Sequence, residues 1–155
     1  MCAVGTIHHP AGNIAVELLK NGLAKMSDWS VRLMSPGDVP ALRVAENNAK
    51  SDDRVIFLAW DGEDPVGVFV GNVASYYFGP DLVATDTIWY VVPEKRGTYV
   101  GIKLLSLFED WARSKGAADI RIGQTSTIKP EVFEGLLEKR GYKFIGANYR
   151  MGTQS

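Results

Sequence analysis

One stretch of the chain combines residue types that bind phosphates, and it lies at a predicted strand-to-helix junction. The stretch is YVVPEKRGTYVGIKLL, residues 90–105, in which a strand ends at Pro93 and an amphipathic helix follows a glycine-containing turn. Backbone N–H groups in the first turn of a helix have no intrahelical partner, and the helix dipole is positive there. The junction therefore predicts an anion site suited to phosphate groups. Basic side chains add positive charge around it: Lys95, Arg96 and Lys103.

The same stretch matches neither of two widespread phosphate-binding motifs. No Gly-Lys-Ser/Thr triplet follows four residues after a glycine, which excludes a P-loop. Gly97 and Gly101 stand four residues apart with Tyr99 between them, which excludes a dinucleotide fingerprint. A tight turn with basic residues on its surface stays an open alternative to a phosphate site.

Other residues that could do chemistry have simpler structural explanations. His8 and His9 are adjacent in a predicted strand, so their side chains point to opposite faces, and we expect no metal site there. The single cysteine, Cys2, excludes an internal disulfide and has no positioned base in view. Core packing explains the aromatic residues better than base stacking does, because the chain is not basic: Trp89, Tyr90 and Trp111.

Hydrophobic periodicity predicts the elements that must position the junction. Apolar runs predict strands over residues 2–9, 54–60, 65–73, 83–92, 118–123, 142–146 and 147–152, with a short extended piece at Val31–Met34. Apolar residues at helical spacing predict helices over about 13–25, 39–50, 101–115 and 129–141. The turn DGED joins the second and third strands as a hairpin, and residues 73–82 form a loop or a frayed strand end. The order β-α-α-β-β-β-α-β-α-β-β predicts a mixed α/β (α+β) sheet with helices on its faces.

Composition narrows the classes of function. The chain has 155 residues, of which 46% are hydrophobic and 23% charged, enough for one domain with its own core. Its 17 lysines and arginines face 18 aspartates and glutamates, and this balance argues against nucleic-acid binding. The first residues show no signal-peptide pattern and no apolar run of membrane-spanning length. We therefore expect a soluble, cytoplasmic protein that binds neither nucleic acid nor membrane.

The segment from about Arg54 to Met151 resembles the GCN5-related N-acetyltransferase (GNAT) family. It has the hairpin FLAWDGEDPVGVFVG, a strand ending in V-x-P-x-x-Arg-Gly, the loop and helix that follow, and the late LLEKRGYKFIG. The residues of the strand-end pattern are Val91, Pro93, Arg96 and Gly97. The resemblance implies a GNAT-like mixed sheet that binds acetyl-coenzyme A and transfers its acetyl group to an amine.

The resemblance also implies which residues hold the cofactor. In the family's Gln/Arg-x-x-Gly-x-Gly/Ala loop, backbone amides bind the pyrophosphate of coenzyme A, and the preceding strand lies beside the pantetheine. Arg96 and Gly101 match the first and last loop positions. Tyr99 replaces the middle glycine, so its N–H can serve only if its φ is negative. The implied cofactor-binding residues are Tyr90, Val91, Val92, Arg96, Gly97, Thr98, Tyr99, Val100, Gly101 and Lys103.

The catalytic part of the family pattern matches less well. Many relatives carry a tyrosine in the last helix that protonates the departing thiolate, whereas this chain has Leu-Leu-Glu-Lys at 136–139. Tyr142 and Tyr149 are the candidate acids in its place, with packing at a strand end as the alternative for each. Asp86, in the strand before the loop, is the candidate base for the substrate amine, with a plain polar position near the strand start as the alternative.

Residues 3–50 resemble a different family, the strand-helix-helix end of a staphylococcal-nuclease-like domain. The likeness is to the repeats of Tudor–staphylococcal-nuclease proteins, and HPAGNIAVELLKNGLA, followed by DWSV and ALRVAE, carries it. The strands that supply metal and phosphate ligands in that fold mostly precede this segment, so the resemblance implies no nuclease activity. The two resemblances meet near Asp53, which suggests a recombined or engineered chimera. We predict a single domain, residues 1–155, in which the segments 1–53 and 54–155 share one core.

Three hypotheses for the function follow. In the first, the chain is an N-acetyltransferase in which a primary amine of a small molecule or peptide attacks acetyl-coenzyme A directly. In the second, the chimera folds and binds at most coenzyme A, without an evolved activity. The third is a nucleic-acid module inherited from the nuclease-like part, which the charge balance disfavours. The thin apolar stripe of the helix at 39–50 leaves both a monomer and a homodimer open.

Overall fold

The computed structural model describes residues 2–9, 52–124, 129–149 and 151–153. They belong to two compact units, the first ending at Arg121 and the second beginning at Ile122. The predicted helices at 13–25 and 39–50 and the extended piece at 31–34 lie outside the described residues.

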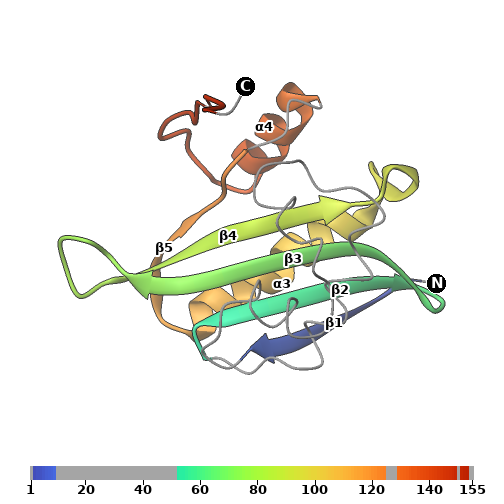
Figure 1. The fold of residues 1–155 in the computed structure, drawn as a ribbon, viewed down its shortest axis with the longest axis horizontal. Coiled ribbons are helices and arrows are strands. Elements are labelled where there is room, and N and C mark those ends of the chain that lie inside the picture. The colour runs from blue at the N-terminus through green and yellow to red at the C-terminus, as the bar shows by residue number, and fades with distance from the viewer. Residues whose placement is uncertain (1, 10–51, 125–128, 150, 154–155) are drawn as a thin grey trace. The chain divides into compact units, whose positions relative to one another are not determined.

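The described part of the first unit is built on a five-stranded mixed sheet whose strands neighbour one another in chain order (Figure 1). Its strands are β1 (Cys2–His9), β2 (Arg54–Asp61), β3 (Asp64–Ser75), β4 (Leu82–Val91) and β5 (Ala117–Arg121). Neighbours from β1 to β4 run antiparallel, whereas β4 and β5 run parallel. Parallel neighbours need a crossover connection, and the helix α3 (Tyr99–Ser114) lies within it.

The hairpin of β2 and β3 confirms the sequence prediction. Asp61 pairs with Asp64, so the turn consists of Gly62 and Glu63. Gly62 has φ of +61°, a conformation that glycine adopts without steric cost. The predicted strands at 2–9 and 83–92 are also confirmed as β1 and β4, and the loop between β3 and β4 is confined to residues 76–81.

α3 covers one face of the sheet through aromatic and aliphatic contacts. Phe108 stacks on Phe69 of β3 with ring centroids 4.6 Å apart, and Phe69 contacts Trp89 of β4 at 5.7 Å. The predicted apolar stripe is confirmed, because the buried residues of α3 include Val100, Leu104, Leu105, Phe108, Trp111 and Ala112. This burial fixes the helix, and therefore its first turn, against the end of β4.

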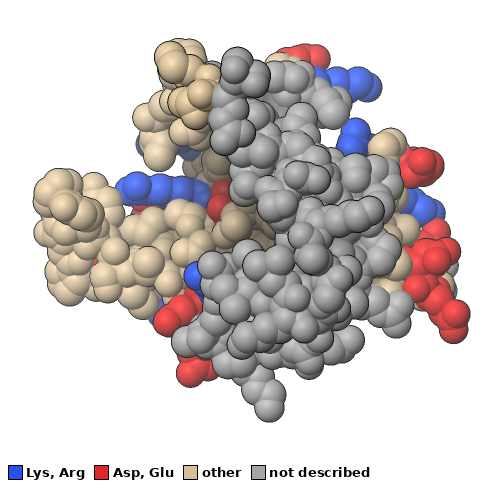
Figure 2. Space-filling model, in the orientation of Figure 1, with Lys and Arg blue, Asp and Glu red and all other residues tan. Residues whose placement is uncertain are grey.

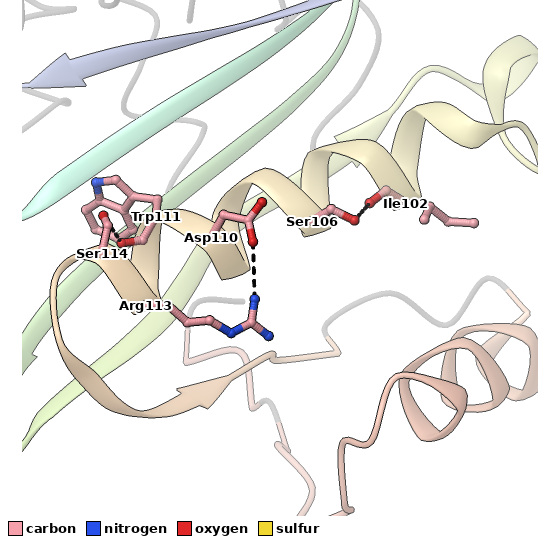
Figure 3. Close-up of polar contacts among 6 residues, drawn as sticks. All are labelled: Ile102, Ser106, Asp110, Trp111, Arg113 and Ser114. Atoms are coloured by element: carbon pink, nitrogen blue, oxygen red, sulfur yellow. Dashed lines mark hydrogen bonds and ion pairs between the residues drawn. The ribbon is translucent and has the colours of Figure 1, made fainter.

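The polar side chains of α3 bond within the helix (Figure 3). Ser106 Oγ donates to the Ile102 carbonyl at 2.9 Å, and Ser114 Oγ donates to the Trp111 carbonyl at 2.6 Å. Arg113 pairs with Asp110 at 3.3 Å, three residues apart and largely exposed. Such local pairs add little to stability, so the packing of α3 on the sheet is what holds it in place.

The opposite face of the sheet carries a second apolar cluster. Its fully buried members come from β2 and β3, with partly buried side chains packed beside them: Ile56, Leu58, Val68 and Val70, then Trp60, Ile88 and Tyr90. Residues two apart on a strand share a face, so this cluster alternates with the residues that α3 covers. Because both faces of β2 and β3 are buried, the sequences of these strands are continuous apolar runs.

The second unit contains the helix α4 (Pro130–Lys139), as predicted. Gly141, with φ of +90°, ends it, and its N–H donates to the Glu138 carbonyl, while the N–H of Tyr142 donates to that of Leu137. These two hydrogen bonds form a Schellman motif. The prediction of two closing strands at 142–146 and 147–152 is wrong for the described residues of that stretch.

The closing segment fails as a strand pair for a physical reason. A strand needs a neighbour for its backbone groups, and no ladder joins residues 142–149 to another described strand. Large apolar side chains of the segment are exposed by three-quarters or more: Phe144, Ile145, Tyr149 and Met151. Short runs that contain these apolar residues produced the strand prediction, but such a run alone does not supply a pairing partner.

Candidate functional site

The loop from β4 to α3 is held by its own backbone and by Thr98. A short 3₁₀ turn, Pro93–Lys95, follows β4, and Gly97 then turns the chain with φ of +77°. Thr98 caps α3: its Oγ accepts from the Val100 N–H at 3.4 Å and donates to the Lys95 carbonyl at 2.6 Å. The Thr98 hydroxyl group thus donates one hydrogen bond and accepts another, and these two bonds hold the loop in a defined conformation.

The first turn of α3 has the features of an anion site. It carries no acidic residue, so no carboxylate neutralises the positive end of the helix dipole. Among the described residues other than glycine, only Lys129 has a positive φ, so Tyr99 meets the condition for using its backbone N–H. The amides of Tyr99, Val100 and Gly101 all belong to this first turn.

Gly101 has a packing role besides its backbone N–H. A β-carbon at this position would lie 3.7 Å from Val91 Cγ2 and 3.8 Å from Trp89 Cζ2. These are ordinary contact distances, so a methyl group fits there but a bulky side chain would push α3 away from β4. The glycine thus allows the helix to begin close to the end of the strand.

Two of the three predicted cations are engaged with the protein. Lys95 Nζ lies 2.5 Å from Asp61 Oδ2 at the β2–β3 turn, and its hydrogen bond and charge lower the pKa of Asp61. Arg96 Nε donates to the Val91 carbonyl at 2.9 Å, and the guanidinium lies 5.4 Å from the centre of the Tyr90 ring. Lys103 is exposed on the next turn of α3. Lys95 is paired with a carboxylate, whereas Arg96 bonds a neutral carbonyl and keeps its charge, so the positive potential of the loop comes from the helix end, Arg96 and Lys103.

β4 continues beyond the last rung of its ladder with β5, and Figure 1 shows the two strands diverging. The ladder ends where Thr85 pairs with Arg121, although β4 runs on to Val91. The N–H of Val92 donates to the Val66 carbonyl, on the β3 side. Backbone groups alternate in direction along a strand, so those of Val91 and Trp89 are directed to the other side.

This alternation divides the strand residues implied by the family resemblance. The backbone groups of Tyr90 and Val92 are directed to β3, and only Val91 is directed to the side where β5 ends. Trp89 shares that direction, and sequence reasoning missed it because its side chain fitted a core position. The hydrogen bond from the Val92 N–H to the Val66 carbonyl is what distinguishes the residues directed to β3 from those directed away from it.

The candidate catalytic residues lie in different environments. Asp86 is half-buried and pairs with Gly71 of β3, and cross-strand partners share a face, so it lies on the face covered by α3. Tyr142 belongs to the second unit, at the end of α4. Tyr149, also in the second unit, is 95% exposed. The roles of these residues as base and acid stay predictions.

Charges on the described surface are mixed in sign. Figure 2 shows basic and acidic side chains interspersed, with acidic ones gathered at the end of the sheet where the β2–β3 turn lies. In the part of the chain that the structure describes, no group of three or more histidine, cysteine, aspartate or glutamate side chains could hold a metal ion. Within the same part of the chain, no helix has the length and apolar character needed to cross a bilayer.

Comparison with known proteins relates the two parts of the chain to different proteins. No family model matches the sequence. A short N-terminal stretch matches staphylococcal nuclease domain-containing protein 1, at 53% identity over 47 residues for Drosophila melanogaster and 40% over 47 for Schizosaccharomyces pombe. The match covers 30% of this chain and 5% of each relative.

The whole chain is similar in structure to acetyltransferases. An aminoglycoside acetyltransferase from an uncultured soil metagenomic sample aligns with a TM-score of 0.64 at 14% identity, covering 99% of each chain. Glucosamine-6-phosphate N-acetyltransferase from Arabidopsis thaliana aligns at 0.63 with 14% identity and 99% of each chain. AAC(6')-Iy, in complex with the bisubstrate analogue CoA-S-monomethyl-acetylneamine, aligns at 0.61 with 15% identity, over 100% of this chain and 99% of that one. The chain therefore has the GNAT acetyltransferase fold, with an N-terminal stretch that resembles staphylococcal nuclease domain proteins.

Proposed function

We propose that the chain binds acetyl-coenzyme A at the junction of β4 and α3 and transfers the acetyl group to a primary amine. One observation carries the proposal: β4 extends past its ladder with β5, and a short loop then leads into a helix whose first turn carries no acidic residue. A strand edge suits an extended amide-containing arm, and a helix N-terminus suits a pyrophosphate. The GNAT fold of the chain supports the same proposal.

Each part of the junction has a role in this proposal. The amides of Tyr99, Val100 and Gly101 hold the pyrophosphate, and the Val100 N–H is shared with Thr98 Oγ1, which lies 3.4 Å away. The N–H of Val91, which is directed away from β3, faces the pantetheine. Because Arg96 already donates to the Val91 carbonyl, we assign it the role of holding the end of β4 in place. Lys103 is assigned the role of attracting the negative charge of the cofactor.

The proposed reaction is direct transfer without a covalent enzyme intermediate. The amine nitrogen forms a bond to the acetyl carbon while the bond from that carbon to sulfur breaks. The amine loses a proton, for which Asp86 is the candidate base, and the thiolate gains one, for which Tyr142 is the candidate acid. The products are an N-acetylated acceptor and free coenzyme A. The proposed acceptors are amines of small molecules or peptides, and the proposed compartment is the cytoplasm.

A second candidate function, coenzyme A binding without turnover, also has an observation in its favour. The N-terminal match to nuclease domain proteins covers 30% of this chain, and the family's first helices wall the acceptor site. If the nuclease-like segment replaced the acetyltransferase's own first helices in a chimera with a single core, binding of acetyl-coenzyme A would survive. Recognition of the acceptor amine would be lost.

Calorimetric titration with acetyl-coenzyme A, followed by a thiol-release assay over a panel of amines, tests both candidates. Heat with thiol release supports the transferase, heat without release supports binding alone, and no heat overturns both. Gly101→Trp should abolish the heat by wedging α3 from Val91 and Trp89. Ile102→Trp is the matched control, because Ile102 is 42% exposed and should bind as the wild type does.

A further inference from the structure

The loop between β3 and β4 carries three aromatic residues in succession and projects beyond the end of the sheet (Figure 1). They are Tyr76, Tyr77 and Phe78, and their exposed fractions are 41%, 89% and 83%. Figure 2 shows the projecting end as mostly tan, the colour of residues other than Lys, Arg, Asp and Glu. Exposed apolar residues that adjoin one another, unlike scattered ones, mark an interaction surface. We call residues 76–81 the aromatic tip.

Backbone hydrogen bonds and ring contacts fix the aromatic tip. The Tyr76 N–H donates to the Asp81 carbonyl at 2.7 Å, and the Gly79 N–H donates to the Tyr76 carbonyl at 3.2 Å. The Phe78 ring makes edge contacts with the rings of Tyr76 and Tyr77, with centroids 6.1 Å and 4.9 Å apart. Because these side chains are already held, binding of a partner costs little of their conformational freedom.

The charges at the aromatic tip favour a cationic partner. Asp81 is the only charged residue among residues 76–81, and it is exposed. Its backbone bond to Tyr76 continues the β3–β4 ladder, so the two side chains lie on one face. The nearby Arg121 is paired with Asp119, whose Oδ2 accepts from Arg121 Nε at 2.8 Å, so this pair adds no net charge.

The chain itself shows how a guanidinium group lies at this tip. The guanidinium carbon of Arg121 is 5.3 Å from the centre of the Tyr76 ring. A cation is attracted to the negative face of an aromatic ring, and the planar group of arginine also stacks on it. Tyr77 and Phe78 present two further rings, with the Asp81 carboxylate in the same loop. The tip is therefore suited to arginine side chains from another molecule.

Two other occupants fit the aromatic tip less well. Complete burial of Tyr77 and Phe78 removes about 300–500 Å² of surface, whereas a stable interface buries about 800 Å² on each partner. The tip alone is thus too small to hold two copies of the chain together. An anionic membrane surface attracts basic residues, and residues 76–81 contain none. A short basic peptide needs neither a large contact area nor a basic surface.

We propose that the aromatic tip is a docking site for a basic peptide, in which Tyr77 and Phe78 stack on arginine side chains and Asp81 attracts their charge. The tip lies at the Leu82 end of β4, whereas the candidate cofactor site lies at the Val91 end, about 30 Å away along ten extended residues. The docking site is therefore independent of the proposed function and stands with or without acetyl transfer.

Fluorescence anisotropy of a fluorescein-labelled hexa-arginine peptide, titrated with the full chain, tests the proposal. We expect Tyr77→Ser and Phe78→Ser each to raise the Kd by about two- to fivefold, and the double variant to raise it by about tenfold. Asp81→Asn should raise the Kd by about twofold at low salt, and this difference should vanish in roughly 1 M salt. Circular dichroism should stay that of the wild type, because all three side chains are exposed.

Two matched variants remove similar groups elsewhere in the chain. Phe144→Ser removes a phenylalanine that is 80% exposed, and Glu63→Gln removes an exposed carboxylate of the β2–β3 turn. Both should bind hexa-arginine as the wild type does. A hexalysine peptide has the same charge and should bind more weakly, because an ammonium group does not stack on a ring as a guanidinium does.

The proposal has distinct outcomes that would overturn it. The first is that hexa-arginine does not bind the wild type, and the second is that hexalysine binds equally well. The third is an unchanged Kd in the double variant of Tyr77 and Phe78. A dimer in analytical ultracentrifugation, or binding to phosphatidylcholine vesicles, that is lost in this double variant would assign the aromatic tip to a second copy or to a membrane instead.

Discussion

The ring of Phe108 fills the space that any side chain at Gly71 would need. A β-carbon on Gly71 would lie 2.2 Å from Phe108 Cε2 and 2.6 Å from Cδ2. The ring also stacks on Phe69 at 4.6 Å, so it packs against two residues on the same face of β3. This contact therefore packs α3 closely against β3.

Gly71→Ala should destabilise the protein by about 1–3 kcal/mol, because the added methyl group overpacks a core with no room for it. Urea unfolding of the variant measures the change. Gly101→Ala is the matched control, since its methyl group would meet neighbours only at 3.7 Å or more, and alanine in a helix gains up to about 1 kcal/mol over glycine. Equal stability of Gly71→Ala and wild type would contradict the packing described for Phe108.

Arg96→Lys should weaken acetyl-coenzyme A binding by roughly 2–5-fold, the equivalent of about 0.5–1 kcal/mol for an exposed cation–aromatic contact. Lysine keeps the charge but loses the planar group that bonds the Val91 carbonyl and lies over Tyr90. Calorimetry measures the affinity, and thermal unfolding should change little because Arg96 is exposed. A variant with wild-type affinity would show that bracing of the strand end does not matter for binding.

The ion pair of Asp61 and Lys95 should make stability depend on pH in the acid range. Lys95 lowers the pKa of Asp61 below its ordinary value of 3.8, so the pair contributes stability above that value. The contribution is lost as the pH falls through the lowered pKa. Asp61→Asn should therefore be slightly less stable than wild type at neutral pH and equally stable at about pH 2.

Unfolding measured across this pH range checks the prediction, with Lys95→Met as the partner control. Asp61 and Lys95 are each about a third exposed, so the effect is small and should shrink in roughly 1 M salt. The double variant should be no less stable than either single one. A stability difference that persists unchanged at about pH 2 would assign the effect of Asp61→Asn to something other than the ion pair.

Local sequence patterns determined much of the described fold and the place of the candidate site. Apolar runs with a Gly-Glu turn define β2 and β3, and helical spacing with a proline and a glycine upstream defines α3 and its first turn. These features depend on residues close together in the chain, so they can be predicted without knowledge of tertiary contacts. The acceptor amine had no such local determinant, and the prediction of two closing strands was wrong for the described residues.

Only the tertiary structure decided how the site's residues are used. Lys95 is paired with Asp61, a residue from another turn, and Arg96, although exposed, donates to the Val91 carbonyl of β4. Asn72 of β3 accepts hydrogen bonds from Thr85 and Thr87 of β4, which lie 13 and 15 residues away in the chain. Each of these results comes from pairing between strands or from contacts distant in sequence, and single-chain periodicity carries no information about a partner strand or a cross-strand bond.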